Sequence, residues 1–171
     1  MISIFLLLGL LVVSAATILM LFRGSMEQPS NLSELLDKLE PFNVGCFRHI
    51  ASDVDDHYLK QKLPGREYRR LRRLRLSAIR AYYASAFHNS SLLLSYGQAL
   101  LRSADPELSA FGQRLNNAAI QLRLALVRGT AGILLCYFMP VDIPYWRQIT
   151  ERYDRMGADL KALCDMHALE F

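Results

Sequence analysis

The sequence predicts an all-α protein in which an N-terminal transmembrane helix is followed by an antiparallel helical bundle with two long helices. The first 22 of the 171 residues contain no charged side chain, as is typical of a membrane-spanning segment. In the rest of the chain apolar residues recur every three or four positions, which is the period of an amphipathic helix, and no stretch alternates as a β-strand would. Two of these helical patterns are long, at residues 66–103 and 106–139, and short connections between helices favour an antiparallel bundle.

The N-terminal segment reads MISIFLLLGLLVVSAATILMLF and is closed by Arg23. At about 1.5 Å of rise per residue, about 20 apolar residues cross the hydrocarbon core of a bilayer. A cleaved signal peptide would instead begin with basic residues and have an apolar core of about 7–15 residues. No Lys or Arg precedes this apolar run. We therefore predict an uncleaved transmembrane anchor over residues 1–23, with the lipid bilayer as the partner of residues 1–22.

The charges beside the anchor indicate its orientation. Arg23 and then Lys38 follow the apolar run, whereas only the amino terminus precedes it. Because basic residues favour the cytoplasmic side of a membrane, we expect the body of the protein to lie in the cytoplasm. The cysteines, Cys46, Cys136 and Cys164, are odd in number and lack C-x-x-C spacing, which fits a reducing compartment. The predicted location is the cell inner membrane, as a single-pass protein.

A linker and a short helix are predicted directly after the anchor. Residues 24–30 form a polar linker, and residues 31–171 form one helical bundle domain. The first short helix of this domain has Ser30 or Ser33 as its N-cap and ends before Pro41.

The segment before the first long helix is less clear. Residues 41–51 are ambiguous between helix and loop. A second short helix begins at Ser52, because the acidic residues that follow favour the positive end of a helix, and it ends at Pro64-Gly65.

Prolines separate the remaining helices. The first long helix is stopped by SADPE, and Ser103 or Asp105 is the predicted cap of the second, with Pro106 in its first turn. The second long helix ends at PVDIP, and a last amphipathic helix covers residues 144–169.

The apolar stretch GTAGILLCYFM, residues 129–139, raises the question of a second membrane span. It has only eleven residues, and extending it backwards takes in Arg128, so its length is typical of a buried core helix. Small residues lie along one side of this helix, where they allow a neighbour to approach closely: Ala118, Ala125, Gly129, Gly132 and Cys136. We predict a core helix, and leave open whether residues 124–141 touch the membrane.

The positive charge of the chain is concentrated in one helix. Residues 66–80 contain seven Arg and one Glu, a net charge of +6, whereas the whole chain carries +4. At about 100° per residue, five of these arginines fall within roughly 100° of one another. This arginine stripe consists of Arg66, Arg69, Arg70, Arg73 and Arg80. The opposite side is apolar and is predicted to face the core: Tyr68, Leu71, Leu74, Ala78, Ile79 and Tyr82.

Three interpretations of the arginine stripe are open. The first is a solvated face that is partly paired with acids. The second is a contact for anionic lipid headgroups, and the third is a contact for nucleic acid. We do not expect nucleic acid as a partner, because no DNA- or RNA-binding motif accompanies the arginines. Arg75 falls on the apolar side, where an unpaired charge is costly. We expect it to reach water or to meet an acid such as Asp105, Glu107, Asp142 or Asp154.

The stretch CFRHIASDVDDHY contains metal-ligand residue types at helical spacing. His49, Asp53 and His57 are four residues apart, a spacing that lets side chains share an ion. On one continuous helix, however, Cys46 and His57 would be about 16 Å apart, too far to share a metal. We favour a solvated helix face and expect no cofactor. A metal-dependent enzyme built on residues 46–57 is the alternative.

Residues 58–76, YLKQKLPGREYRRLRRLRL, resemble segments of uncharacterised bacterial single-pass membrane proteins, which also place Pro-Gly before an arginine-rich helix. The resemblance covers less than a fifth of the chain. It implies a membrane-anchored helical architecture and no particular activity. With no catalytic motif in the sequence, we expect a membrane-anchored, non-enzymatic interaction or scaffold module, which uses its arginine stripe to contact anionic lipid or another membrane protein.

Overall fold

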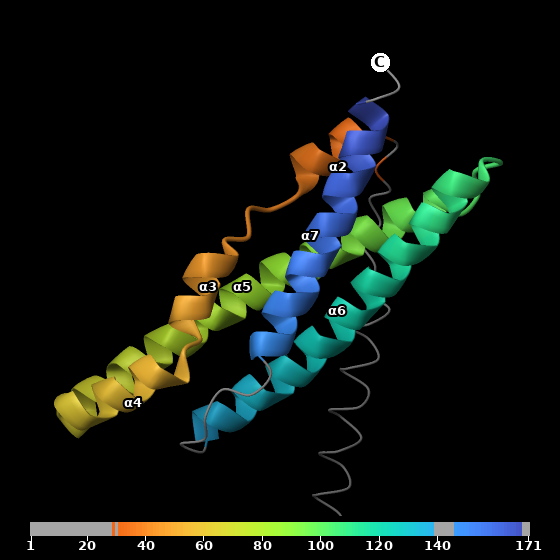
Figure 1. Ribbon diagram of the computed structural model, residues 1–171. Coiled ribbons are helices and arrows are strands. Elements are labelled where there is room, and N and C mark those ends of the chain that lie inside the picture. The colour runs from red at the N-terminus through yellow and green to blue at the C-terminus, as the bar shows by residue number, and fades with distance from the viewer. Residues whose placement is uncertain (1–28, 30, 139–145, 169–171) are drawn as a thin grey trace, which may run out of the picture.

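The computed structural model describes residues 29, 31–138 and 146–168, and this part of the chain is all-α, without a strand (Figure 1). Its helices, in chain order, are α2 (Leu32–Lys38), α3 (Val44–Ile50), α4 (Asp53–Lys62), α5 (Gly65–Leu100), α6 (Pro106–Phe138) and α7 (Trp146–Ala168). The predicted all-α helical bundle with two long helices is thereby confirmed. The predicted anchor, residues 1–23, lies outside the described residues. Within them, no helix has the length and apolar character that crossing a membrane requires.

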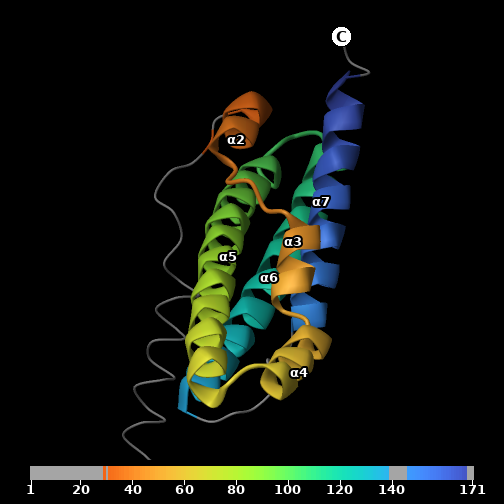
Figure 2. The ribbon, with the colours of Figure 1, turned by 90° about the vertical axis from the view of Figure 1, so that its left-hand side faces the viewer.

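Three helices form the body of the bundle. Helix α5 packs along α6, and α7 runs back along the other side of α6 (Figures 1 and 2). The short helices lie on one side of this body: α2 and α4 contact α5, and α3 contacts both α5 and α7. Helix α4 therefore lies beside the first turns of α5, at the end of the molecule where the arginines are concentrated (Figure 2).

Asparagine side chains begin the first two described helices. Asn31 accepts a hydrogen bond from the backbone N–H of Glu34 at 2.8 Å, so the cap of α2 is Asn31 and not Ser30 or Ser33. Asn43 caps α3 in the same way, through the N–H of Cys46 at 2.9 Å. The ambiguous residues 41–51 therefore contain a helix.

The remaining helix starts follow the predicted positions. Ser52 precedes α4 as predicted, although its side chain makes no capping hydrogen bond. Before α6, the Asp105 carboxylate accepts from the N–H of Glu107 at 2.8 Å, and Pro106 is the first residue of the helix.

Glycines set the distance between α5 and α6. A Cβ atom on Gly112 would lie 2.7 Å from the carbonyl oxygen of Gly97, so only glycine allows this backbone contact. Further along α6, a Cβ on Gly129 would lie 2.6 Å from the ring of Tyr83 on α5 and 2.9 Å from Ile149 on α7. Helix α6 is therefore held closely from two sides.

The predicted strip of small residues on α6 largely faces this core. Ala125, Gly129, Gly132 and Cys136 are all buried, whereas Ala118 is half-buried. The prediction of a core helix is thus confirmed by the burial of these four positions, and at Gly129 side chains from both α5 and α7 approach α6.

A buried asparagine ties the segment between α2 and α3 to the bundle. The amide of Asn89 on α5 accepts from the backbone N–H of Glu40 at 2.9 Å and donates to the Glu40 carbonyl at 2.8 Å. It also donates to the hydroxyl of Tyr153 on α7 at 2.8 Å. Beside it, the ring of Phe42 stacks on Tyr153 with centroids 4.0 Å apart. One polar side chain thus joins three segments of the chain.

Candidate functional site

The arginine stripe occupies the first half of α5, and all five of its members are exposed. The predicted orientation of these side chains is confirmed. Arg80 lies fourteen residues after Arg66, which corresponds to about 21 Å along a straight helix. The guanidinium groups of the stripe therefore form a line along one side of one helix and do not converge on a point.

No acid of the described part of the chain pairs with the stripe. The ion pairs found there join Lys38 to Glu34, Arg48 to Asp154 and Arg75 to Asp56. The interpretation of the stripe as a face partly neutralised by acids thus has no supporting pair among these residues. With respect to the described residues, the five guanidinium groups keep their hydrogen-bond donors for water or for an external anion.

The core-facing side of α5 is rotated relative to the prediction. Leu76, Ile79 and Tyr83 are buried, with at most 4% of their surface exposed, whereas Leu74 is 59% exposed. The prediction that Leu74 faces the core is wrong, because α6 contacts α5 on the side of Tyr83. Leu74 follows Arg73 directly and is one turn from Arg70, so an apolar side chain borders the stripe.

Arg75 is an arginine of this helix that contributes directly to the fold. Only 12% of its side chain is exposed, and its Nη1 donates to Oδ1 of Asp56 at 2.7 Å. Its Nη2 donates to the carbonyl oxygens of Ile50 at 3.0 Å and Ser52 at 2.8 Å. Arg75 thereby binds the end of α3 and the start of α4 to α5.

The expectation that Arg75 meets an acid is confirmed, although the acid is Asp56 and not one of the candidates named from the sequence. Asp154 pairs with Arg48 instead, and Asp105 and Glu107 lie at the start of α6, beyond the far end of α5. Asp142 is outside the described residues. The true partner, Asp56, comes from α4, which returns along the first turns of α5 and brings its acid to Arg75.

Asp56 has a second bond to α5. The hydroxyl of Tyr68 donates to Oδ2 of Asp56 at 2.9 Å, and burial, together with this carboxylate, raises the pKa of Tyr68. Both oxygens of the Asp56 carboxylate are thus engaged in holding α4 against α5. This carboxylate is occupied structurally and is a poor candidate for a ligand of an external ion.

The residues considered for a metal site are separated by the break between α3 and α4. His49 lies at the end of α3, Asp53 is the first residue of α4, and His57 lies one turn later. Both histidines are exposed. In the described ranges no group of three His, Cys, Asp or Glu side chains could hold a metal ion.

Two further arginine environments were missed by the sequence reasoning. Arg123 on α6 is 2% exposed, bonds to the hydroxyl of Ser91 on α5, and lies 5.0 Å from the centroid of the Phe87 ring. Burial lowers its pKa. The only signal in the sequence is a lone arginine between the apolar residues Leu122 and Leu124.

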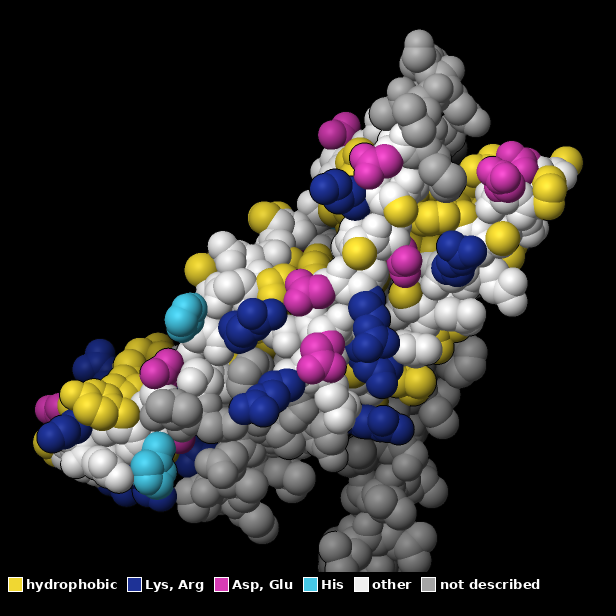
Figure 3. All heavy atoms as spheres, in the orientation of Figure 1, with side chains coloured by type: hydrophobic (Ala, Val, Ile, Leu, Met, Phe, Trp, Pro, Cys, Tyr) yellow, Lys and Arg dark blue, Asp and Glu magenta, His cyan; other side chains and the backbone are white. Residues whose placement is uncertain are grey.

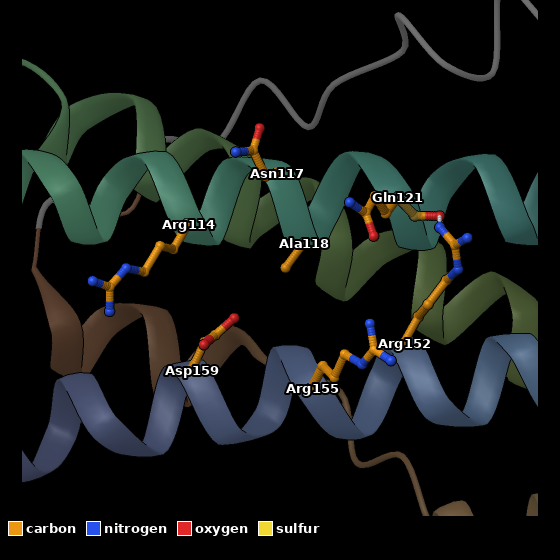
Figure 4. Close-up of a pocket in the computed structure, with 7 residues that line it drawn as sticks. All are labelled: Arg114, Asn117, Ala118, Gln121, Arg152, Arg155 and Asp159. Atoms are coloured by element: carbon orange, nitrogen blue, oxygen red, sulfur yellow. Dashed lines mark hydrogen bonds between the residues drawn. The ribbon is translucent and has the colours of Figure 1, made fainter.

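The second environment is a groove of about 270 Å³ between α6 and α7 (Figure 4). Its lining residues are Arg114, Asn117, Ala118, Gln121, Arg152, Arg155 and Asp159. The α6 members and the α7 members each recur at three- or four-residue intervals, which places each set on one face of its helix. This spacing is visible in the sequence, but nothing there shows that the two faces meet.

No protein family, curated protein or solved structure matches the chain.

Proposed function

We propose that the protein is a membrane-anchored, non-enzymatic interaction or scaffold module, whose arginine stripe rests against anionic lipid headgroups. The observation that carries the proposal is the exposure of all five stripe arginines, none of which pairs with an acid of the described residues. A basic residue close to an anionic leaflet contributes about 1 kcal/mol of binding free energy. Five such residues on one helix face therefore provide a substantial membrane affinity.

The shape of the stripe supports an extended partner. Its charges are spread over about 21 Å along one side of a helix, which suits a flat anionic surface better than a compact ligand. The exposed side chain of Leu74 borders the stripe. An apolar group beside basic residues is the composition that amphipathic helices use at the headgroup boundary.

The proposed anchor places the body within reach of the membrane. Residues 1–22 would cross the bilayer, and the seven residues of the linker 24–30 extend by at most about 24 Å. The segment after α2 is bonded to Asn89 of α5, nine residues beyond Arg80, which is about 14 Å along the helix. A linker of this reach allows the stripe to face the leaflet. In this proposal the body is cytoplasmic, where the leaflet carries a negative surface potential.

The experiment that tests this proposal is co-sedimentation of residues 24–171 with vesicles, with and without anionic phosphatidylglycerol, at low and high salt. We expect binding that requires the anionic lipid and weakens with salt. The triple variant R66Q/R70Q/R73Q should bind about 100-fold more weakly, since about 1 kcal/mol is lost at each position.

A matched control removes three exposed charges that lie outside the stripe, in the variant R102Q/R128Q/K161Q. It carries the same net charge as the stripe variant and should keep most of the vesicle affinity. Sedimentation that ignores the anionic lipid content, or an equal loss in both triple variants, would contradict the proposal. Binding of duplex DNA with a steep salt dependence, in the absence of lipid binding, would contradict it as well and would assign the stripe to nucleic acid.

A further inference from the structure

We infer that the groove between α6 and α7 is a binding site for the phosphate group of a small phosphate monoester. This site lies away from the arginine stripe and does not depend on the proposed membrane contact. Lys and Arg side chains, with Asp and Glu side chains among them, lie where α7 passes alongside α6 in the space-filling view (Figure 3). Unlike the stripe, the groove draws its charges from two helices, α6 and α7, which line it from opposite sides (Figure 4).

The arginines of the groove are arranged around its opening. Arg152 and Arg155 extend from α7 next to each other at one end, and Arg114 extends from α6 at the other (Figure 4). The Nη1 of Arg152 donates to the backbone carbonyl oxygen of Gln121 at 2.8 Å, which fixes this guanidinium group across the groove. A guanidinium group that is already held in place loses less conformational entropy when it binds an anion.

The groove carries a positive charge that its own residues do not neutralise. Three arginines face one acid, Asp159, so the lining has a formal charge of +2. Arg114 and Arg155 make no ion pair or hydrogen bond with any residue of the described part of the chain. A phosphate monoester carries about −1.5 to −2 charges at pH 7, which matches this lining. Guanidinium groups also bind phosphate oxygens in pairs, through two parallel hydrogen bonds.

The dimensions of the groove favour a small ligand. Its volume of about 270 Å³ exceeds what a phosphate group alone would fill, and leaves room for a short organic portion. The small side chain of Ala118 keeps the middle of the groove open, between the longer residues on either side (Figure 4). The carboxylate of Asp159 also points into this space and provides an acceptor for a hydroxyl group of the ligand (Figure 4).

The test is phosphorus NMR of the full chain in nanodiscs, with glycerol 3-phosphate as the soluble probe and phosphatidic acid as the lipid probe. We expect a saturable shift of the glycerol 3-phosphate resonance. Arg155→Gln should raise the dissociation constant at least tenfold, because it removes a charge-assisted pair of hydrogen bonds. Ala118→Leu should abolish the shift by filling the groove without changing its charge. Arg102→Gln, which removes an equal charge outside both the groove and the stripe, should leave the shift unchanged.

The two probes distinguish the source of the phosphate. A response of glycerol 3-phosphate that Arg155→Gln and Ala118→Leu remove assigns the groove to a soluble phosphate monoester. A response of phosphatidic acid alone, removed by Ala118→Leu, assigns it to a lipid phosphate. If neither resonance changes with the groove substitutions, in variants that retain the helical circular dichroism of the parent protein, the inference is wrong. Failure of the membrane proposal for the stripe would leave each of these results unaffected.

Discussion

The two sides of the first half of α5 use the same residue type for opposite purposes. Arg73 and Arg75 are two positions apart, yet Arg73 is exposed, without an ion pair to any acid of the described chain, whereas Arg75 is 12% exposed and bonded to Asp56 and two backbone carbonyls. The difference arises from α4, which returns along one side of α5 and leaves the other side uncovered. Arginines on the covered side hold the fold together. Those on the uncovered side remain available to a partner outside the chain.

The largest difference between the two sides of α5 is expected when Arg75 and Arg73 are each replaced and the free energy of unfolding is measured. Arg75→Ala leaves the Asp56 carboxylate and two carbonyl oxygens without their donor, and should lower the free energy of unfolding by about 2–3 kcal/mol, since both partners are partly exposed. Arg73→Ala should change it by less than about 0.5 kcal/mol. Urea denaturation followed by circular dichroism measures both values. Equal effects at the two positions would remove the distinction between the sides of α5.

Leu74 tests whether the uncovered side meets lipid. Because its side chain is 59% exposed, Leu74→Gln should leave the unfolding free energy within about 0.5 kcal/mol of the parent value. If the side chain enters the headgroup boundary, the same substitution should weaken vesicle binding by about 1 kcal/mol, or roughly fivefold. Vesicle titration of the two proteins provides the comparison. An unchanged vesicle affinity would limit the membrane contact to the arginines.

Tyr83 lies on the side of α5 that faces α6, and it makes the stability of the protein depend on pH. Its hydroxyl is buried and has no hydrogen-bond partner in the described structure, and burial raises its pKa well above the ordinary value. Below about pH 10 the folded and unfolded states both keep this proton; above it, the unfolded state releases the proton first, so stability falls as pH rises. Burial also raises the pKa of Tyr68, Tyr96 and Tyr153, which adds to the decline.

Tyr83→Phe should therefore make the alkaline loss of stability shallower. Near neutral pH it should increase the free energy of unfolding by up to about 1 kcal/mol, because it removes an unsatisfied buried hydroxyl. Denaturation curves at several pH values between about 8 and 11 test both expectations. A clear destabilisation at neutral pH would indicate that the hydroxyl has a bonding role in solution.

A smaller loss of unfolding free energy than at Arg75 is expected at Tyr68. Tyr68→Phe removes one hydrogen bond to Asp56 while Arg75 keeps its own, so the unfolding free energy should fall by about 0.5–1 kcal/mol. In the double variant with Arg75→Ala, the two losses should not be additive, because both substitutions act on one carboxylate. Strict additivity in this double-mutant cycle would show that the two bonds act independently.

The sequence alone predicts the features that depend on one helix. Prolines and glycines mark the ends of α5 and α6, and the arginine pattern places the stripe on an exposed face, as the structure confirms. Periodicity cannot show which helix covers which side, because that depends on how α4 and α6 return along α5. This explains the errors at Leu74 and in the choice of an acid for Arg75.

The groove illustrates the same limit. Arg114 and Arg155 are 41 positions apart in the sequence, and each on its own resembles an ordinary exposed helix residue. Only the antiparallel packing of α6 and α7 brings them to one space. The close contact of Gly97 with Gly112 likewise depends on how two helices cross, and is not visible in the pattern of either.

The most direct test of the central claim measures which side of the full chain lies on the membrane. A fluorescent label is attached at Ser77→Cys, between Arg73 and Arg80 on the exposed side of α5, or at Ala158→Cys on α7, in a chain whose Cys46 and Cys164 are replaced by Ser. In nanodiscs with anionic lipid, we predict that a quencher in the headgroup region quenches the Ser77 label strongly and the Ala158 label weakly. This difference should disappear when the anionic lipid is omitted. Equal quenching of the two labels in anionic nanodiscs would contradict the account.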